Sequence, residues 1–417
     1  MAGTIQAVRG MNDVLPGESA RWLKLEDTVR AVFSQYGYRN IRTPIVEKTE
    51  LFVRGVGEVT DIVEKEMYKF DDHGESLSLR PEGTAPTVRA ALEHNLLYDG
   101  PKRLWYSGPL FRHERPQKGR YRQYHTFGVE ALGYAGPDID IEQLIMVDRL
   151  WKRLGLAGMT LELNTIGSSE ERRAFRAQLV EYFERHSDRL DEDARRRLHT
   201  NPLRILDSKN PAMQELIEGA PKLWDALGAP SRALFEAVER GVHDAGIDYR
   251  FNPRLVRGLD YYNATVYEWV TTRLGAQSGV CSGGRYDGLF AQLGGKPTPG
   301  CGFGIGVERV LLLLDDQGST ASDAPDAYFV HVGERASRLA IEVAENLRDA
   351  GLAITVHAGG GNFGAQMKRA DASGARFALI VGDNEADARV VGVKPLRVAG
   401  EQVSVDPHEL AARLAAR

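Results

Sequence analysis

The sequence predicts a chain of mixed helices and strands in two folded parts, with a helical insertion inside the first part. Three observations support this prediction. Two strand-like segments flank a polar loop within residues 110–133, residues 168–245 show helical periodicity without a clear strand, and a strand–helix–strand–helix pattern follows a polar linker at residues 315–325. The last pattern is typical of a small α/β domain with a mostly parallel sheet.

The composition is that of an ordinary globular protein: the chain has 417 residues, of which 42% are hydrophobic and 27% are charged. At about 150 residues per domain, this length predicts two or three domains. The longest purely apolar run, Val310–Leu314, is far too short to cross a bilayer, and the N-terminus lacks a charged-then-apolar signal segment. We therefore expect a cytoplasmic protein with no membrane partner.

Charge and cysteine content bear on two further classes of protein, those that bind nucleic acid and those that bind zinc. The net charge of −5 argues against an overall basic coat for nucleic acid, although it leaves room for a local basic surface. The two cysteines, Cys281 and Cys301, have no neighbouring Cys or His at zinc-finger spacing. We expect reduced thiols with structural roles and no protein-bound zinc.

The first predicted unit is a helix followed by a strand. Apolar residues recur at helical spacing over Arg21–Tyr36, with Ser19 as a candidate cap and Gly37 as a candidate end. A strand over Tyr38–Val46 follows, with Pro44 near its end, because proline is tolerated at a sheet edge or interface. The pair is either simple core packing or a unit used for dimerisation.

A short strand, a turn and a helix are predicted over Leu77–Thr87, with the helix beginning at about Pro86. Glu82 and Thr84 lie at the turn. A carboxylate at the end of a strand is well placed to receive a ligand's ammonium group. An acid at a helix start can instead satisfy backbone N–H groups, and these residues alone support both interpretations equally.

The hairpin predicted over Leu110–Gly133 concentrates positive charge. Its ends have strand-like apolar residues, and Pro116 and Gly119 break the middle into a loop. Between residues 112 and 125 the only acid is Glu114, whereas five permanent cations lie there: Arg112, Arg115, Lys118, Arg120 and Arg122. Because a planar guanidinium binds carboxylate or phosphate oxygens in pairs, we predict an anion-binding site rather than a solvated charged hairpin.

Beyond the hairpin, a helix is predicted over Ile139–Leu154 and a strand over Thr160–Ile166. The composition then changes: Ser168–Ala245 is helical and highly charged, which indicates an inserted helical subdomain. Its basic run Arg195–Arg197 is either a solvated face or a surface for RNA. Strand-like sequence resumes in two later segments, Tyr249–Phe251 and Thr265–Val270.

Two short stretches combine charged residues with tyrosines or glycines. Leu255–Asn263, LVRGLDYYN, contains the adjacent Tyr261 and Tyr262. Adjacent strand residues face opposite sides, so we expect one tyrosine to line a pocket and the other to pack. Gly279–Leu289 has a glycine pair before Arg285, which indicates either close backbone approach to a ligand or a tight turn.

The stretch Gly300–Leu314, GCGFGIGVERVLLLL, begins as a strand with an unusual face. Glycine occupies every second position: Gly302, Gly304 and Gly306. In a strand, this alternation leaves one face without side chains, on which a flat ring can lie. Glu308 and Arg309 then open an apolar helix, which places Arg309 beside the bare face.

The C-terminal part follows the linker. Its predicted strands and helices are Ala327–Val332, Arg335–Ala350, Leu352–His357, Ala365–Ala372 and Arg376–Val381. Gly359–Gly364, GGGNFG, formally matches the dinucleotide motif G-x-G-x-x-G, and Asp383 lies about twenty residues further on. Because this turn is not the first of its domain, and about 90 residues is small for a dinucleotide fold, we favour a flexible glycine loop.

Together these stretches resemble the class II aminoacyl-tRNA synthetases. Residues 111–130, FRHERPQKGRYRQYHTFGVE, resemble their motif 2, residues 302–314 look like motif 3, and the helix–strand unit of residues 21–46 looks like motif 1. Two further stretches, LVRGLDYY and GGRYDGL, are similar to the signatures of histidyl-tRNA synthetases within this class. The likeness runs from near Val8 to the C-terminal domain.

The resemblance implies an α+β catalytic domain over residues 1–325, with an antiparallel sheet flanked by helices and a helical insertion at about residues 168–250. Residues 326–417 would form an α/β anticodon-binding domain. The protein would be a homodimer joined through motif 1, with its insertion near the tRNA acceptor stem. It would be a histidine–tRNA ligase: L-histidine and ATP would give histidyl-adenylate and pyrophosphate, and histidine would then pass to the 3′ end of histidine tRNA.

The resemblance also implies site residues, with Arg112 and Arg257 as the catalytic pair. The implied histidine-binding residues are Glu82, Gly83, Thr84, Arg112, Thr126, Glu130, Arg257, Tyr261 and Tyr262. The implied ATP-binding residues are Arg112, Glu114, Arg120, Tyr124 and Arg309. Mg²⁺ would arrive with ATP and bridge its phosphates.

The family's pattern gives the ATP-binding residues separate tasks. Arg112 would bridge the histidine carboxylate and the α-phosphate. Arg257 would contact the α-phosphate from the other side, where other class II enzymes use a metal-binding acid. Arg120 would hold the γ-phosphate, and the adenine would lie between Tyr124 and Arg309 over the glycine strand.

The pattern also divides the histidine pocket. Glu82 and Thr84 would take the α-ammonium group. Glu130 and Tyr262 would bind the two ring nitrogens of the imidazole, for which a carboxylate and a phenol are suited. The family often has Gln where this chain has Thr126, and the shorter side chain leaves space for a water in place of a direct contact.

Three alternatives stay open at the level of sequence. Another class II synthetase, for threonine, proline or glycine, would share motifs 1–3, although LVRGLDYY and GGRYDGL point away from it. A catalytically silent relative that regulates ATP phosphoribosyltransferase would resemble the catalytic domain, but it would lack the anticodon domain and have eroded motifs. A nicotinamide-binding enzyme would use GGGNFG.

Overall fold

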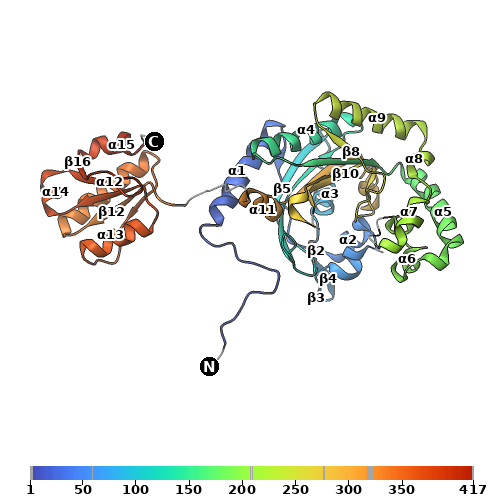
Figure 1. The fold of residues 1–417 in the computed structure, drawn as a ribbon, viewed down its shortest axis with the longest axis horizontal. Coiled ribbons are helices and arrows are strands. Elements are labelled where there is room, and N and C mark those ends of the chain that lie inside the picture. The colour runs from blue at the N-terminus through green and yellow to red at the C-terminus, as the bar shows by residue number, and fades with distance from the viewer. Residues whose placement is uncertain are drawn as a thin grey trace. The chain divides into compact units, whose positions relative to one another are not determined.

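The structure is a computed structural model that describes residues 3–58, 60–206, 208, 210–275, 278–316 and 323–415. The chain divides into two compact units, residues 1–320 and 321–417 (Figure 1). Among the described residues, no helix is both long and apolar enough to cross a membrane.

The first unit is built on an eight-stranded sheet in the order β1-β5-β6-β11-β10-β9-β7-β8. Neighbours from β5 to β7 run antiparallel, whereas the outer pairs β1–β5 and β7–β8 are parallel. The predicted antiparallel sheet is therefore confirmed, with one parallel strand at each edge. In sheet order the strands are Arg39–Asn40, Lys102–Phe111, Gln123–Leu132, Gly300–Gly306, Gly279–Arg285, Asn263–Val270, Thr160–Thr165 and Tyr249–Phe251.

Strands β5 and β6 form the predicted hairpin, with a register that runs from Lys102 opposite Leu132 to Phe111 opposite Gln123. Every residue of β6 from Thr126 onward is buried. Because successive strand residues face opposite sides, this pattern means that both faces of β6 are covered. The basic loop of residues 112–122 therefore begins and ends on rigidly held backbone.

Four helices pack with the large sheet in one hydrophobic core: α1 (Ser19–Gln35), α4 (Pro137–Arg153), α9 (Ala229–Asp244) and α11 (Val307–Asp315). The first helix buries Leu25, Val29 and Val32, as its periodicity predicts. Ser19 lies inside this helix rather than capping it, because the helix begins one residue after Glu18 and no side chain caps it.

The predicted strand over Tyr38–Val46 is wrong for most of its length. Ile41 N–H still donates to Trp105 O at 2.8 Å, but residues 41–45 are not in a strand. The Arg80 guanidinium takes the place of a neighbouring strand: its Nη1 donates to Thr43 O at 3.1 Å. Pro44 has no N–H to add to a ladder, so the chain leaves the sheet here.

A small three-stranded sheet, ordered β2-β4-β3, follows: β2 Val46–Lys48, β4 Glu75–Leu79 and β3 Lys69–Asp72. Helix α2 (Thr49–Val56) packs on helix α3 (Thr84–Glu93) beside it. The predicted strand, turn and helix around Glu82 are present, and the helix begins at Thr84 rather than at Pro86.

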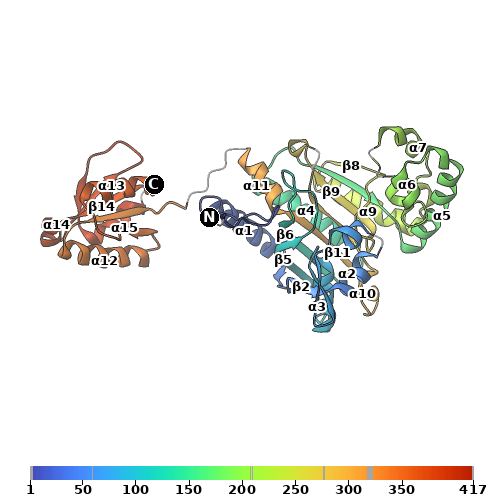
Figure 2. The same cartoon turned by 90° about the horizontal axis from the view of Figure 1, so that it is seen from below.

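The predicted helical insertion is present, and the described part of residues 169–245 contains no strand. Its helices are α5 (Ser169–Arg185), α6 (Glu192–Arg197), α7 (Gln214–Glu218) and α8 (Leu223–Ala226). These helices form a group to one side of the large sheet (Figure 2) with a hydrophobic cluster of their own, which includes Phe175, Leu179 and Phe183. Helix α9 packs instead on α4 in the main core, so the separately packed part ends near residue 226.

The second unit has a five-stranded sheet in the order β13-β12-β14-β15-β16. Its first three strands are parallel, as predicted, and β15 and β16 add antiparallel strands that were not predicted. The strands are β12 Ala327–His331, β13 Ile354–Val356, β14 Phe377–Val381, β15 Val391–Pro395 and β16 Val403–Val405. The helices are α12 Glu334–Asp349, α13 Phe363–Ala372, α14 Asp383–Ala388 and α15 Leu410–Ala415.

Candidate active site

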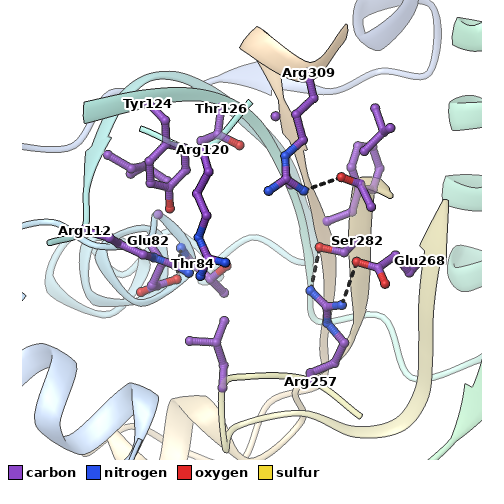
Figure 3. Close-up of a pocket in the computed structure, with 18 of the residues that line it drawn as sticks. Glu82, Thr84, Arg112, Arg120, Tyr124, Thr126, Arg257, Glu268, Ser282 and Arg309 are labelled. Atoms are coloured by element: carbon purple, nitrogen blue, oxygen red, sulfur yellow. Dashed lines mark hydrogen bonds and ion pairs between the residues drawn. The ribbon is translucent and has the colours of Figure 1, made fainter. Parts of the chain in front are cut away.

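A cavity of about 330 Å³ opens on the face of the large sheet and is lined by parts of the chain more than 200 residues apart in sequence. Of the thirteen predicted site residues, twelve line this cavity: Glu82, Gly83, Thr84, Arg112, Glu114, Arg120, Tyr124, Thr126, Arg257, Tyr261, Tyr262 and Arg309. The exception is Glu130. Figure 3 shows that Arg309 and Arg257 enter from opposite ends, with Arg112 and Arg120 on a third side.

The β5–β6 hairpin positions Arg112 and Tyr124. Both side chains hydrogen bond to the same backbone oxygen, that of Pro81: Arg112 Nε at 2.9 Å and Tyr124 Oη at 3.1 Å. The Arg112 guanidinium also lies 5.7 Å from the centre of the Tyr124 ring, within cation–π distance. Two anchors on one carbonyl leave the other guanidinium nitrogens of Arg112 directed at the cavity.

The hairpin loop holds a second arginine close to its only acid. Arg120 Nε forms an ion pair with the Glu114 carboxylate. Arg309 reaches the same loop from helix α11, because its Nε donates to Gly119 O at 3.1 Å. Arg309 Nη1 also donates to Gly279 O, which fixes the guanidinium between the loop and strand β10.

The predicted bare face of strand β11 exists only at its second half. A Cβ on Gly302 would lie 2.1 Å from Glu130 Oε2, so the neighbouring strand already covers that position. Gly304 and Gly306 line the cavity. Thr126 borders this surface, and its hydroxyl donates to Ile305 O at 3.1 Å. The platform for a flat ring is thus two glycines long.

Glu82 accepts hydrogen bonds at a helix start and also borders the cavity. Its carboxylate accepts from Thr84 N–H at 2.7 Å and from Ala85 N–H at 2.9 Å, which caps helix α3, and the side chain also lines the cavity. Burial raises the pKa of this carboxyl above its ordinary value. A carboxylate has about four lone-pair sites, so the cap leaves capacity for a ligand's ammonium group.

Glu130 lies beneath the cavity rather than in its lining. It is 1% exposed, and its carboxylate accepts hydrogen bonds from Thr84 Oγ1 at 2.7 Å, from Tyr106 Oη at 3.2 Å and from the hydroxyl of Tyr286. Burial is the main reason that the pKa of Glu130 rises to about 8. Thr84 and Tyr106 do line the cavity, so they connect it to this buried acid.

Gly83 has a steric role beside Tyr106 in the lining of the cavity. A Cβ at Gly83 would lie 2.2 Å from the Tyr106 ring, and one at Gly128 would lie 2.0 Å from it. The ring therefore lies flat between two glycines. Substitution of either glycine would push the Tyr106 hydroxyl away from Glu130.

Arg257 is held from the opposite wall. Its Nη2 donates to Ser282 Oγ at 2.6 Å, and its Nη1 lies 3.4 Å from Glu268 Oε1 (Figure 3). The guanidinium lies 6.0 Å from the centre of the Tyr262 ring. These contacts hold the positive charge at the edge of the cavity.

The expectation that only one of Tyr261 and Tyr262 lines the pocket is wrong. Tyr261 is in a turn and Tyr262 directly precedes strand β9, so neither lies in a strand and the alternation of strand side chains does not apply. Their rings lie 4.7 Å apart and both border the cavity. The Tyr261 hydroxyl lies 3.4 Å from the Glu82 carboxylate.

Neither interpretation of the glycine pair in Gly279–Leu289 is correct, because Gly283 and Gly284 lie within strand β10. A Cβ on Gly283 would lie 2.3 Å from Gly302 O, and one on Gly284 would lie 2.4 Å from Thr265 O. These glycines permit close approach of two neighbouring strands, not of a ligand.

The following Arg285 is a structural residue. It is 1% exposed and forms ion pairs with Asp140 at 2.6 Å and with Asp287 at 3.1 Å. Its guanidinium is buried on these two carboxylates, and Arg285 does not line the cavity. The adjacent Tyr286 contributes through its hydrogen bond to Glu130.

Four further polar residues line the cavity and are not among the predicted site residues: Tyr106, Tyr121, Glu268 and Ser282. Glu268 had a signal, because it is the one charged residue of the apolar strand NATVYEWV. Ser282 and Tyr106 had none, since their importance depends on partners that the fold brings from elsewhere.

Comparisons with known proteins agree with the geometry. Residues 10–310 match the histidyl-tRNA synthetase family, and residues 326–417 match the anticodon binding domain. The chain is 62% identical to the histidine–tRNA ligase of Nitrosomonas europaea over 97% of each chain, and 58% identical to that of Laribacter hongkongensis over 100% of each. The crystal structure of apo S. aureus histidyl-tRNA synthetase has a TM-score of 0.82 and 34% identity, covering 99% of this chain and 100% of that one.

These matches favour a histidine–tRNA ligase over the regulatory relative and over another class II synthetase. They span both units of the chain, including the C-terminal part that a regulatory relative would lack. The chain belongs to the histidyl-tRNA synthetase family, a branch of the class II aminoacyl-tRNA synthetases.

Proposed function

We propose that the cavity joins L-histidine to ATP and then transfers the histidyl group to histidine tRNA. The single observation that carries this proposal is the arrangement of four arginines, Arg112, Arg120, Arg257 and Arg309, around one cavity that also contains two glycines of a bare strand. Such a site fits a polyphosphate with a flat base.

The first step brings two anions together. The histidine carboxylate oxygen attacks the α-phosphorus of ATP, a new acyl–phosphate bond forms, and the bond to the pyrophosphate oxygen breaks. Positioning and charge neutralisation supply most of the catalysis in such a transfer. Arg112 would hold the carboxylate against the α-phosphate, while Arg257 would neutralise the α-phosphate from the opposite wall.

The remaining ATP contacts follow from the same geometry. Arg120 would bind the γ-phosphate after exchanging its ion pair with Glu114. The adenine would lie over Gly304 and Gly306, between Tyr124 and Arg309. Stacking against a guanidinium and a tyrosine ring does not distinguish one base from another. Recognition of adenine therefore needs a polar group at the edge of the base, and Glu114 near the rim is the candidate.

The histidine substrate would lie deeper. Glu82 and Thr84 would take its α-ammonium group, with Tyr261 beside them and Gly83 admitting the Tyr106 ring. Tyr262 and Glu130 would bind the two imidazole nitrogens. The support for Glu130 is its connection to the cavity: Thr84 and Tyr106 both line the cavity and both hydrogen bond to the buried Glu130 carboxyl group. A polar group hidden from water discriminates strongly between ligands that can and cannot hydrogen bond to it.

Mg²⁺ would be brought by ATP rather than held in advance. No group of three or more His, Cys, Asp or Glu side chains in the described part of the chain is arranged to hold a metal. Glu114 and Glu268 border the cavity, and Mg²⁺ commonly uses one or two carboxylates together with substrate phosphates and waters. When bound, it would neutralise charge on the leaving pyrophosphate.

In the second step, the terminal ribose hydroxyl of the tRNA attacks the histidyl carbonyl and AMP leaves. The second unit would bind the anticodon stem-loop. We also propose a cytoplasmic homodimer joined through residues 21–46, because apolar side chains there are exposed: Leu23 by 58%, Ile45 by 43% and Val46 by 40%.

The test is amino-acid-dependent exchange between pyrophosphate and ATP without tRNA, over a panel of amino acids. We expect exchange with histidine alone. Exchange with another amino acid would retain the chemistry and overturn the specificity. No exchange with any amino acid, from folded protein, would overturn the assignment of Arg112 and Arg257.

A further inference from the structure

The loop between strands β8 and β9, residues 252–262, separates the active-site cavity from the helical insertion. Arg257 lines the active-site cavity on one side. It also lines two further cavities on the side of the insertion, of about 600 Å³ and about 40 Å³. This loop is also packed into the fold: Leu255, Tyr261 and Tyr262 are buried in one hydrophobic cluster, against which Leu223 of the insertion packs.

Asp260 is where the insertion contacts this loop. Asp260 lines the smaller cavity together with Arg172, Asn201 and Arg204 of the insertion. Burial raises the pKa of the Asp260 carboxyl, while the positive charges of Arg204, Arg172 and Arg176 lower it. We call these five residues the Asp260 junction. Arg172 makes a second contact, because its Nη1 donates to the backbone oxygen of Tyr262.

Asp260 is fixed from the catalytic side as well. Its N–H donates to Val56 O at 3.0 Å, at the end of helix α2. Gly57 follows with a φ of +104°, and a Cβ there would lie 2.6 Å from Asp260 Oδ2. The same part of the catalytic unit meets the insertion again, since Arg197 lies 3.4 Å from Asp61.

The insertion packs mainly on itself. Helices α5, α6 and α7 share a hydrophobic cluster that includes Phe175, Phe183 and Leu216, distinct from the core of the large sheet. Its approach to the 252–262 loop combines the apolar contact of Leu223 with charged groups, and it leaves the two cavities described above. Among the charged groups, the Asp260 junction and the bond from Arg172 to Tyr262 O lie directly at the loop.

We propose that Asp260 is a positioning residue, which uses the docked insertion to hold Arg257 and Tyr262 in place and so sets the affinity for histidine. This inference rests on the proposed function. Removal of the carboxylate would leave Arg172, Arg176 and Arg204 facing one another without a counter-charge. Their repulsion would move the insertion away, and the loop would lose the support behind Tyr262.

The test uses Asp260→Asn in the full chain, with histidine-dependent pyrophosphate exchange. The substitution keeps the shape and removes the charge. We expect the KM for histidine to rise about tenfold or more, which is the size of effect that loss of a charge-assisted contact produces. The KM for ATP should change less than about twofold. Arg189→Gln is the matched control, because Arg189 pairs with Glu215 within the insertion, at 2.8 Å, and both KM values should stay as in the wild type.

A second variant separates positioning from simple loss of structure. In Asp260→Asn/Arg204→Gln, one of the uncompensated cations is also removed, so the KM for histidine should return most of the way to the wild-type value. Should Asp260→Asn not fold, Arg172→Gln takes its place, since it removes the donor to Tyr262 O and should raise the KM for histidine selectively.

Failure of this inference differs from failure of the proposed function. Wild-type protein without histidine-dependent exchange would overturn the proposed function. With an active wild type, the inference is overturned by an unchanged KM for histidine, by an equal rise in both KM values, or by a double variant no better than the single one.

Discussion

The two walls of the cavity hold their arginines in different ways. Arg112 follows a ten-residue strand pair and is anchored to a backbone oxygen that also anchors Tyr124. Arg257 lies in a loop, and its partners are the side chains of Glu268 and Ser282. The hairpin wall is therefore set by backbone register, whereas the loop wall is set by side chains and by what packs behind it.

This difference divides the work of the site. A wall fixed by the sheet can bind the substrate anions in one geometry without adjustment, which favours preorganised charge stabilisation. A wall held by side chains can respond to its surroundings, including the insertion. Variants that affect the two walls unequally test this division.

The largest effect is expected for Arg257→Lys. Lysine keeps the charge but loses the planar two-point contact and the fork that bonds Ser282 and Glu268. We expect single-turnover formation of adenylate to fall about a hundredfold or more, with the melting temperature close to that of the wild type. Rapid-quench measurement of adenylate at saturating histidine and ATP would show this.

Arg254→Lys provides the matched control for this prediction. Arg254 lies in the same loop but bonds Gln214 of the insertion at 3.2 Å, away from the cavity. Its adenylation rate should be within about twofold of the wild type, as expected for a surface substitution. An Arg257→Lys enzyme with near wild-type single turnover would remove the role given to Arg257 and the distinction between the walls.

Glu130→Ala is expected to act on one substrate only. Glu130 lies on β6 in the hairpin wall, beneath Thr84 and Tyr106, where we propose that the imidazole binds. Loss of a buried hydrogen-bonding group leaves its partners unsatisfied, so the KM for histidine should rise about tenfold or more while that for ATP changes little. Equal changes in both KM values, measured by pyrophosphate exchange, would contradict the imidazole assignment.

Glu130 also predicts a pH dependence of stability. Its pKa is about 8 in the folded protein against an ordinary value of 4.5, so the folded state retains a proton that the unfolded state loses. The contribution of Glu130 to the free energy of unfolding is fully present below pH 4.5. It decreases by about 1 kcal/mol per pH unit as the pH rises toward 8. Glu130→Gln cannot ionise, so its stability relative to the wild type should increase from pH 6 to pH 8.

Urea unfolding at the two pH values, followed by tryptophan fluorescence, measures this difference. Glu142→Gln serves as the control, because Glu142 pairs with Arg103 at 2.9 Å in a half-exposed position on the same unit. The control should follow the pH trend of the wild type. If Glu130→Gln follows it as well, the proton is not held by Glu130.

The contrast between the walls also explains what could be predicted from sequence. The glycine strand and the first three strands of the second unit have local patterns, and the sequence predicts each within a few residues. The sequence also predicts the hairpin, but its first strand begins at Lys102, well before the predicted start at Leu110. Strands β15 and β16 are not predicted because VSV is only three residues long and VGVKP is interrupted by glycine and ends in proline. Nothing in such segments signals a strand until its neighbour is in place.

The loop wall was harder to predict because its contacts are not local. The opposite directions predicted for Tyr261 and Tyr262 require a strand, and neither residue lies in one. The partners of Arg257 come from two other strands, so no spacing along the chain indicates them. Glu130 was chosen from the family's pattern, and only the fold shows that three hydroxyl groups surround it.

The smallest effect is expected at Thr126, where the chain departs from the family's usual glutamine. Its hydroxyl is already used by Ile305 O at 3.1 Å, so it has little left to offer a ligand. Thr126→Val, which keeps the shape, should change the KM for histidine less than about threefold and lower stability by about 1 kcal/mol through the lost hydrogen bond. A tenfold rise in the KM for histidine would show instead that the Thr126 hydroxyl contacts the substrate. The hairpin wall would then bind histidine through one more side chain than its geometry indicates.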